Sequence, residues 1–361
     1  MLQCFFDDGL RRNSYLLACP RSRTAVVVDP RRDVDVYVEA ARSLGVRIGY
    51  VFETHLHGDA ASGARELLAV GASVIAGPGV NLRYAHHQAA DGERLRVGDL
   101  SILFLHTPGH APEHLSILTS QPDQPVRLFT GDTLLTGGVG LPDGADADEN
   151  HRLADALHDS LFRKILPLDD RIVLHPGHAS EPTLDASGSP HFTTIGHERR
   201  TSPMLQLESK AAFVKAILRD IQAPSPVSAR LRKLNQDGPP LLGLVNGYRG
   251  PAGISPGAAA AAVRSGALVA DLRNALEFAA GHPRGAVNVP AGVTATGRAL
   301  YALPHDPRVV LLAADAREAL EASRQLLRAG VSRIDGYISG GFQAWQAARL
   351  PTSQSPSVLS V

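Results

Sequence analysis

One turn near residue 55 constrains the fold of this chain more than any other feature of its sequence. Residues 48–53 form a largely apolar run that is typical of a buried strand. The run leads directly into the sequence ETHLHGD at residues 53–59, which carries His55, His57 and Asp59 within five positions. Imidazole and carboxylate groups at a strand end indicate a cradle for a metal ion.

The same arrangement recurs three times further along the chain. Each time a short apolar run, readable as a strand, ends and presents a His or Asp at its carboxyl edge. His110 follows residues 101–105, Asp132 follows residues 126–129, and His178 follows residues 171–174. Because four strand ends deliver ligand-type side chains, we predict that these side chains meet at one site.

The candidate metal ligands are His55, His110 and Asp132. Neutral imidazole and carboxylate are the donors that a divalent transition metal takes when thiolates are absent, and two His with one Asp suit iron. Three protein ligands leave coordination positions open for a substrate. A glycine lies in the turn beside each ligand, which lets the backbone crowd the ion.

Asp59 has two interpretations. Residues 60–70 have the pattern of a helix, so the metal-binding turn is expected at a helix N-terminus. Asp59 would then either support the imidazoles by hydrogen bonding, together with His57, or cap that helix.

The overall composition excludes several kinds of partner. A chain of 361 residues exceeds one ordinary core, so two domains are expected. Acidic and basic residues number 36 each, which gives no electrostatic case for nucleic acid or an anionic membrane. No segment approaches the roughly 20 apolar residues of a membrane span. The N-terminal residues lack the apolar stretch of a signal peptide, so we expect a cytoplasmic protein.

The cysteine content limits the chemistry of any metal site. The sequence has only Cys4 and Cys19, which excludes a disulfide framework and a CxxC zinc or redox motif. A metal site must therefore use His and carboxylate ligands. We expect both cysteines to be small buried side chains in an N-terminal sheet.

The chain divides into three stretches by its pattern. Residues 1–190 alternate strand-like runs with a few helices and contain the candidate ligands. Residues 191–253 are polar and interrupted by prolines, and we expect a helical connector that completes the first domain. Residues 254–361 alternate strands and helices, which indicates a small α/β domain with a parallel sheet.

The histidine motifs resemble the signature of the metallo-β-lactamase superfamily, which is HxHxDH followed by a later His, an Asp and a final His. The matching pieces are HLHGDA at residues 55–60, then His110, Asp132 and His178. This resemblance implies an αββα sandwich for the first domain. The motif's last position is Ala60, which cannot coordinate a metal, so one metal ion is expected rather than two.

Four longer fragments resemble the bacterial persulfide dioxygenases that are fused to rhodanese domains: ETHLH at 53–57, TPGHAPE at 107–113, GDTL at 131–134 and TTIGHERR at 193–200. The resemblance implies one Fe(II) per chain, held by His55, His110 and Asp132. His57, Asp59 and His178 would support these ligands or mark a vestigial second metal position. The implied reaction oxidises a low-molecular-weight persulfide, such as glutathione persulfide, to sulfite and thiol.

Two positions depart from the pattern of these dioxygenases. The motif after the GD pair usually reads Gly-Arg-Pro-Asp, whereas this chain has Leu141 at the arginine position. His197 stands where a tyrosine is usual. Either departure can change which persulfide the enzyme accepts.

The C-terminal residues resemble a rhodanese domain. The matching fragments are DLR at 271–273, EFAAGHPRGAVNVP at 277–290 and GGFQAW at 340–345. A working rhodanese presents a cysteine after its central strand, but Ala313 occupies that position and no cysteine follows Cys19. We therefore predict an inactive domain that serves as a scaffold or contacts a protein partner or a second copy of the chain.

Two alternatives to a sulfur dioxygenase remain open at this stage. One is a Zn(II)-dependent thioester hydrolase similar to hydroxyacylglutathione hydrolase, in which zinc ionises the attacking water. Ala60 counts against it, whereas His57, Asp59 and His178 favour it. The other is a non-catalytic sulfur-relay scaffold, which the degenerate rhodanese loop favours and the intact ligand set does not.

Overall fold

The computed structural model describes residues 1–178, 192–207, 209–221, 225–292, 295–304 and 306–355. The chain forms two compact units, one of residues Met1–Gly58 with Ser62–Gly238 and one of Asp59–Ala61 with Pro239–Val361. The predicted boundary at residues 190 and 191 lies outside the described residues.

The first sheet of unit 1 has six strands in the order of the sequence. The first three pair antiparallel, and each later strand is parallel to its predecessor. Helices α1 (Asp35–Ser43) and α2 (Ala64–Leu68) contact this sheet. The strands are β1 (Leu2–Asp7), β2 (Arg12–Cys19), β3 (Thr24–Val28), β4 (Arg47–Phe52), β5 (Ser73–Ala76) and β6 (His87–Gln88).

The second sheet of unit 1 also has six strands, and only β10 and β13 pair parallel within it. A short hairpin, β11 (Leu134–Leu135) with β12 (Gly138–Val139), follows one of its central strands. In spatial order the strands are β14 (Thr193–Thr194), β13 (Val173–Pro176), β10 (Arg127–Gly131), β9 (Leu115–Ser120), β8 (Leu100–His106) and β7 (Arg94–Val97).

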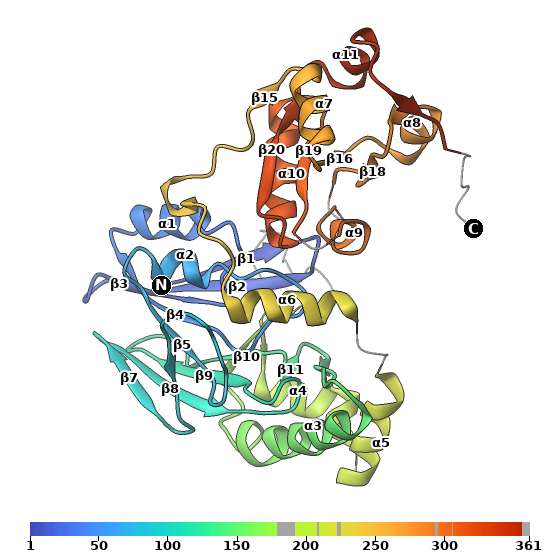
Figure 1. The fold of residues 1–361 in the computed structure, drawn as a ribbon. Helices are drawn as coiled ribbons and strands as arrows, with labels where there is room; N and C mark the ends of the chain where they lie inside the picture. Colours follow the sequence, from blue (N-terminus) through green and yellow to red (C-terminus); the bar gives the residue numbers. More distant parts are fainter. Residues whose placement is uncertain (179–191, 208, 222–224, 293–294, 305, 356–361) are drawn as a thin grey trace. The chain divides into compact units, whose positions relative to one another are not determined.

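The main core of unit 1 lies between these two sheets. Alternate residues of facing strands, such as Tyr15, Phe104 and Phe129, are buried there. A second apolar cluster joins the outer face of the second sheet to helices α3 (Ala147–Asp159) and α5 (Lys210–Asp220), for example through Leu157 and Phe213. Two sheets with helices on both outer faces are the predicted αββα sandwich, and that prediction is confirmed (Figure 1).

The two sheets are also joined by polar contacts at the end of β13. The Tyr15 hydroxyl and the Asn13 side chain, both on β2, donate to the Pro176 carbonyl at 2.6 and 3.2 Å. The backbone N–H of Asn13 donates to the Gly177 carbonyl at 2.7 Å. These bonds fix the backbone immediately before His178.

Two helices of unit 1 differ from the expectation. The helix predicted over residues 60–70 is only the five residues of α2, and its N-cap Gly63 contributes no side-chain hydrogen bond. The interpretation of Asp59 as a helix cap is therefore wrong, because the loop continues for four residues beyond it. The apolar pattern of Leu157, Leu161 and Ile165 predicts a helix over residues 154–166. Helix α3 starts earlier, at Ala147, where the Asp146 side chain accepts from Glu149 N and caps it.

The expected helical connector contains α4 (Ile195–Thr201), α5 and α6 (Pro226–Asp237), with short 3-10 turns at Pro203–Gln206 and Leu244–Asn246. Pro203 and Pro226 lie at helix starts rather than in helix interiors. Pro226 is the first residue of α6, where its missing N–H costs nothing, and the Ser225 side chain caps the helix.

Unit 2 is built on a five-stranded sheet whose described pairings are all parallel. In spatial order the strands are β15 (Gly253–Ile254), β20 (Arg333–Ile338), β19 (Arg308–Leu312), β16 (Leu268–Asp271) and β18 (Val287–Asn288). The helices are α7 (Pro256–Arg264), α8 (Ala275–Ala280), α9 (Ala295–Ala302), α10 (Ala316–Arg328) and α11 (Gly341–Ala347). The predicted small α/β domain with a parallel sheet is confirmed.

No helix in the described part of the chain is long and apolar enough to span a bilayer.

Candidate metal centre

Three strand ends bring His55, His110 and Asp132 together. His55 follows β4, His110 follows β8, and Asp132 follows β10 directly. The Nε2 atoms of both histidines lie 3.7 Å from Asp132 Oδ2. All three donor atoms lie within 4.8 Å of one another, so the three predicted ligands do converge.

Hydrogen bonds at the far side of each imidazole set which nitrogen faces the cluster. The Thr54 hydroxyl uses its hydrogen to donate to Asp29 Oδ2. Its oxygen, 3.0 Å from His55 Nδ1, therefore accepts a hydrogen bond from that nitrogen. His110 Nδ1 donates to the Leu141 carbonyl at 2.6 Å. In the neutral tautomers that these bonds select, both Nε2 atoms present a lone pair to the space beside Asp132. Burial, with further contributions from neighbouring imidazoles, holds the pKa of His55 well below its usual range.

Asp132 is held by two other histidines. His178 Nδ1 donates to its carboxylate, at 2.8 Å from Oδ1 and 3.0 Å from Oδ2. The Asp132 amide donates to His114 Nε2 at 3.1 Å. His178 thus restrains the carboxylate while Oδ2 faces the two imidazoles.

His114 is a buried structural partner that the sequence reasoning did not single out. Burial, and then the charge of His110, lower its pKa to about 3, so it stays neutral. Its Nδ1 lies 3.1 Å from the Thr107 hydroxyl and 3.0 Å from the Thr133 hydroxyl. The neighbouring Gly131 has a φ of 46°, and a Cβ there would lie 2.5 Å from His114 Nε2. Only glycine allows β10 to pass this close to the ring.

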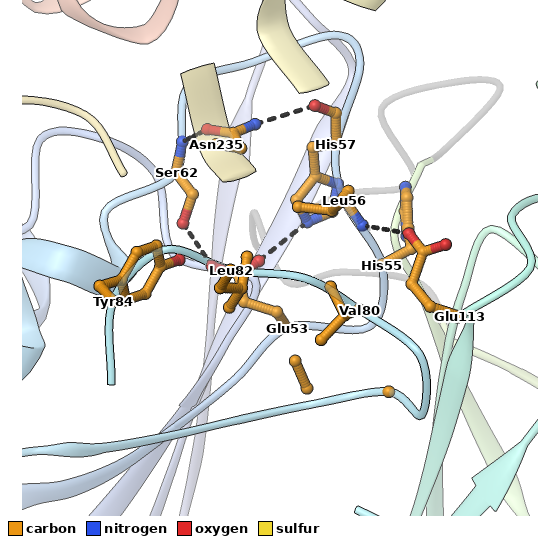
Figure 2. A pocket seen from close by; sticks show the side chains of 12 residues that line it. Glu53, His55, Leu56, His57, Ser62, Val80, Leu82, Tyr84, Glu113 and Asn235 are labelled. Atoms are coloured by element: carbon orange, nitrogen blue, oxygen red, sulfur yellow. Dashed lines mark hydrogen bonds and ion pairs between the residues drawn. The ribbon is translucent and has the colours of Figure 1, made fainter. Parts of the chain in front are cut away.

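His57 faces away from the three ligands into a different buried cluster. Its Nε2 lies 3.3 Å from both Asp29 Oδ1 and Glu53 Oε2 (Figure 2 draws the Glu53 contact). Burial and Arg12 lower the pKa of His57, but the two carboxylates outweigh them and raise it to about 9. His57 is therefore charged at neutral pH and pairs with the carboxylates. Asp29 was missed by the sequence reasoning, although it follows the apolar strand β3 just as the ligands follow theirs.

The described residues contain two groups with metal-ligand geometry, His55–His110–Asp132 and Asp29–Glu53–His57. Asp59 belongs to neither group, and Ala60, which offers no donor atom, is buried. His178 contacts Asp132 but joins neither group. Of the six candidate residues, the structure brings three within reach of one ion. It places His178 against Asp132 and the ring of His57 4.1 Å from that of His55.

The donor set fits a single divalent cation. Ligand atoms bound to one cation at about 2.1 Å lie roughly 3 to 3.5 Å apart, so the observed 3.7 Å spacing needs only a small contraction. Two imidazole nitrogens and one carboxylate oxygen on one face are the arrangement of iron sites with open positions.

A cleft of about 500 Å³ opens from this centre. His110, Asp132 and His178 lie at its metal end, and apolar side chains such as Leu135 and Leu141 line its wall. Leu141 orients His110 through its main-chain carbonyl, so this contact survives the absence of arginine at that position. The imidazole of His197, on α4, does not line this cleft among the described residues.

Two amides at the loop after β19 in unit 2 are engaged by carboxylates of the same loop and helix. Ala313 is buried at the position of the missing cysteine. The next amide, of Ala314, donates to Glu318 Oε2 at 2.6 Å, and the Glu318 amide donates to Asp315 Oδ1 at 2.8 Å. The chain's own carboxylates therefore occupy the donors that would stabilise an anionic sulfur.

Known proteins match this chain over both units. Residues 7–178 match the profile of the metallo-beta-lactamase superfamily, and residues 255–348 match that of the rhodanese-like domain. A hydroxyacylglutathione hydrolase of Polaromonas sp. is 31% identical over 256 residues, which cover 64% of this chain and 89% of that protein. The chain belongs to the metallo-β-lactamase superfamily. This superfamily member carries a C-terminal rhodanese-like domain in addition.

Other relatives of this metallo-β-lactamase-fold protein match different shares of it. Hydroxyacylglutathione hydrolase of Francisella tularensis is 34% identical over 176 residues, and the match covers 48% of this chain and 65% of that enzyme. A crystal structure of a metallo-beta-lactamase from Staphylococcus aureus has a TM-score of 0.78 and 27% identity, covering 93% of this chain and 98% of its own. The structure of ETHE1 from Myxococcus xanthus has a TM-score of 0.56 and 28% identity, covering 69% and 100%.

Proposed function

We propose that this protein is a mononuclear non-haem iron enzyme that oxidises a low-molecular-weight persulfide to sulfite and the free thiol. The observation that carries the proposal is the cluster of His55, His110 and Asp132, a group that includes neither His57 nor Asp59. Resemblance to persulfide dioxygenases in the ligand motifs and similarity to ETHE1 support the same assignment.

The surroundings of the cluster favour one metal over two. His57 is engaged with Asp29 and Glu53, so its imidazole is not directed at the cluster. Ala60 offers no donor atom. A hydrolase that uses two zinc ions needs further ligands in these places, whereas a dioxygenase needs one metal with free positions for sulfur and oxygen.

The reaction balances without a further oxidant. A persulfide R–S–SH, dioxygen and water give R–SH and sulfurous acid: the S–S bond breaks, the terminal sulfur is oxidised and dioxygen is reduced. Iron, when bound, supplies the redox chemistry that zinc lacks. Its protein ligands leave one side open to the cleft, whose apolar wall of residues such as Leu135 and Leu141 suits the sulfur end of a thiol.

The deciding experiment is metal analysis and oxygen uptake on protein purified without oxygen. We expect iron near one equivalent per chain and oxygen consumption that depends on an added persulfide, with sulfite as product. Asp132→Ala should lose both metal and turnover, whereas His151→Ala, an exposed histidine on α3, should keep both. The proposal would be contradicted if oxygen uptake by the iron-loaded protein did not depend on the added persulfide.

A second candidate is a zinc-dependent thioester hydrolase, because the 31–34% identical relatives are hydroxyacylglutathione hydrolases. It predicts zinc in the purified protein and thioester cleavage in the absence of oxygen. Measuring both reactions on the same iron-loaded and zinc-loaded preparations separates the candidates.

We further propose that the rhodanese-like unit contacts a protein partner or a second copy of the chain rather than transferring sulfur. Ala313 and the occupied amides of its loop support this proposal. If the whole protein were only a scaffold, Asp132→Ala would leave partner binding intact and no turnover would exist to lose.

A further inference from the structure

One face of helix α6 lies against both loops that carry the histidine ligands. Ser228, Arg232 and Asn235 are spaced four and three residues apart, so they project from the same side of the helix. We call these three residues the α6 brace. All three belong to unit 1, as do the ligands they approach.

Asn235 joins the two ends of the metal-binding turn. Its Nδ2 donates to the His57 carbonyl at 2.8 Å, and its Oδ1 accepts from the Ser62 amide at 2.8 Å (Figure 2). The side chain is only 2% exposed. Because one planar amide supplies both the donor and the acceptor, it closes the turn in the way that a pair of strand hydrogen bonds would. An aspartate here would lose the donor and place an oxygen against a carbonyl.

The turn touches the brace a second time at Gly58. A Cβ added to Gly58 would lie 2.1 Å from Ser228 Oγ and 3.1 Å from Ser228 Cβ. A methyl group at this position would therefore require the Ser228 side chain to move.

The other two residues of the brace hold the loop that orients His110. Arg232 pairs with Asp143 Oδ2 at 2.7 Å, and the Ser228 hydroxyl donates to the same oxygen at 3.0 Å. The Asp143 amide donates to the His110 carbonyl at 2.9 Å. Two residues earlier, the Leu141 carbonyl accepts from His110 Nδ1. The helix thus reaches His110 through a short chain of contacts.

We propose that the α6 brace is a positioning element that sets the metal affinity of the centre by holding the turn of His55 and the loop of His110 in register. This proposal rests on the metal site proposed above. None of the brace residues belongs to the ligand group, and only Ser228 lines the cleft. The brace acts through the backbone of His57 and Ser62 and through Asp143. Supporting contacts of this kind are typically worth 10- to 100-fold in metal affinity or activity.

The test measures metal binding directly on the full chain. Apoprotein is titrated with Co(II) and, without oxygen, with Fe(II), in competition with a chelator. Asn235→Asp and Arg232→Ala should each weaken binding by about 10- to 100-fold and shift the visible absorption of the bound Co(II). Lys233→Ala, on the exposed side of the same helix, should bind like wild type.

A pair of substitutions separates positioning from general damage to the fold. Gly58→Ala should weaken metal binding in the wild-type background because its methyl group meets Ser228. In a Ser228→Gly background, which lacks those atoms, the same substitution should cost little further affinity relative to Ser228→Gly alone. Such a dependence on the background is not expected if Gly58→Ala merely destabilises the unit. The double variant also keeps the test valid if Asn235→Asp fails to fold.

The outcomes distinguish the two proposals. Folded brace variants that bind metal within twofold of wild type overturn the brace. A second outcome is that the wild-type protein binds metal, the brace variants bind it more weakly, and no persulfide is oxidised. That outcome overturns the proposed reaction but supports the brace. If His110→Ala has the same metal affinity as the wild type, both proposals are overturned.

Discussion

Under our proposal, His178 serves the metal centre without binding the metal. It donates to the Asp132 carboxylate and so limits the rotation that would carry Oδ2 away from His55 and His110. The same imidazole would be a ligand in a two-metal arrangement, but Ala60 offers no donor atom and Asp59 lies in neither ligand group. The neighbours of His178 therefore decide its role.

We predict that His178→Ala keeps one metal per chain but weakens its binding by about 10- to 100-fold. The carboxylate loses a donor and gains rotational freedom. Competition with a chelator, compared with His151→Ala as an exposed control, measures the change. Complete loss of the metal would show that His178 is itself a ligand.

At the scale of single elements, the loop between β19 and α10 supports the proposal that unit 2 does not transfer sulfur. A catalytic loop needs free amides around its nucleophile. Here Glu318 accepts from Ala314 and Asp315 caps α10. Both carboxylates also oppose an anionic sulfur donor.

We predict that Ala313→Cys alone does not produce thiosulfate sulfurtransferase activity, because the new thiol gains no anion-binding partners. Thiocyanate formation from thiosulfate and cyanide measures the activity. The double variant Ala313→Cys/Glu318→Ala removes the carboxylate that accepts from the Ala314 amide. Comparing its activity with that of the single variant shows whether this carboxylate blocks the loop. Robust activity of the single variant would refute the prediction.

At the scale of the whole molecule, a bound metal should stabilise one of the two units. The three ligands follow β4, β8 and β10, which belong to both sheets of unit 1, so an ion would tie these sheets together. A ligand that binds only the folded state adds about 2.7 kcal/mol at a free concentration of 100 times its Kd. Unit 2 contributes none of the three ligands.

We predict that removing the metal with a chelator lowers the unfolding temperature of unit 1 by about 5–11 °C, since each kcal/mol is worth roughly 2–4 °C in a unit of this size. Calorimetry should show the shift in one transition only. In His110→Ala the chelator should have little effect. Equal shifts of both transitions would contradict the assignment of the site to unit 1 alone.

The sequence predicted the ligands because each one follows a strand, and the period of apolar residues reveals strands well. Asp29 carries the same signal after β3 and could have been found by it. Asn235 could not, since it lies in mid-helix and reaches partners 173 and 178 residues away in the chain. Contacts of that kind depend on how α6 docks on the sandwich, which no local pattern encodes. The length of helix α2 was overestimated for a similar reason. Residues before Ala64 form a loop, and distant contacts such as those of Asn235 with His57 and Ser62 hold it.

The bond from His110 to position 141 has an evolutionary consequence. The acceptor is a main-chain oxygen, which every amino acid possesses, while the leucine side chain faces the cleft. Mutation at this site can therefore reshape the chamber for a different thiol without disturbing how the imidazole is aimed. Under the proposed function, substrate preference and metal retention can therefore drift independently, and position 141 is a natural place to begin changing the substrate.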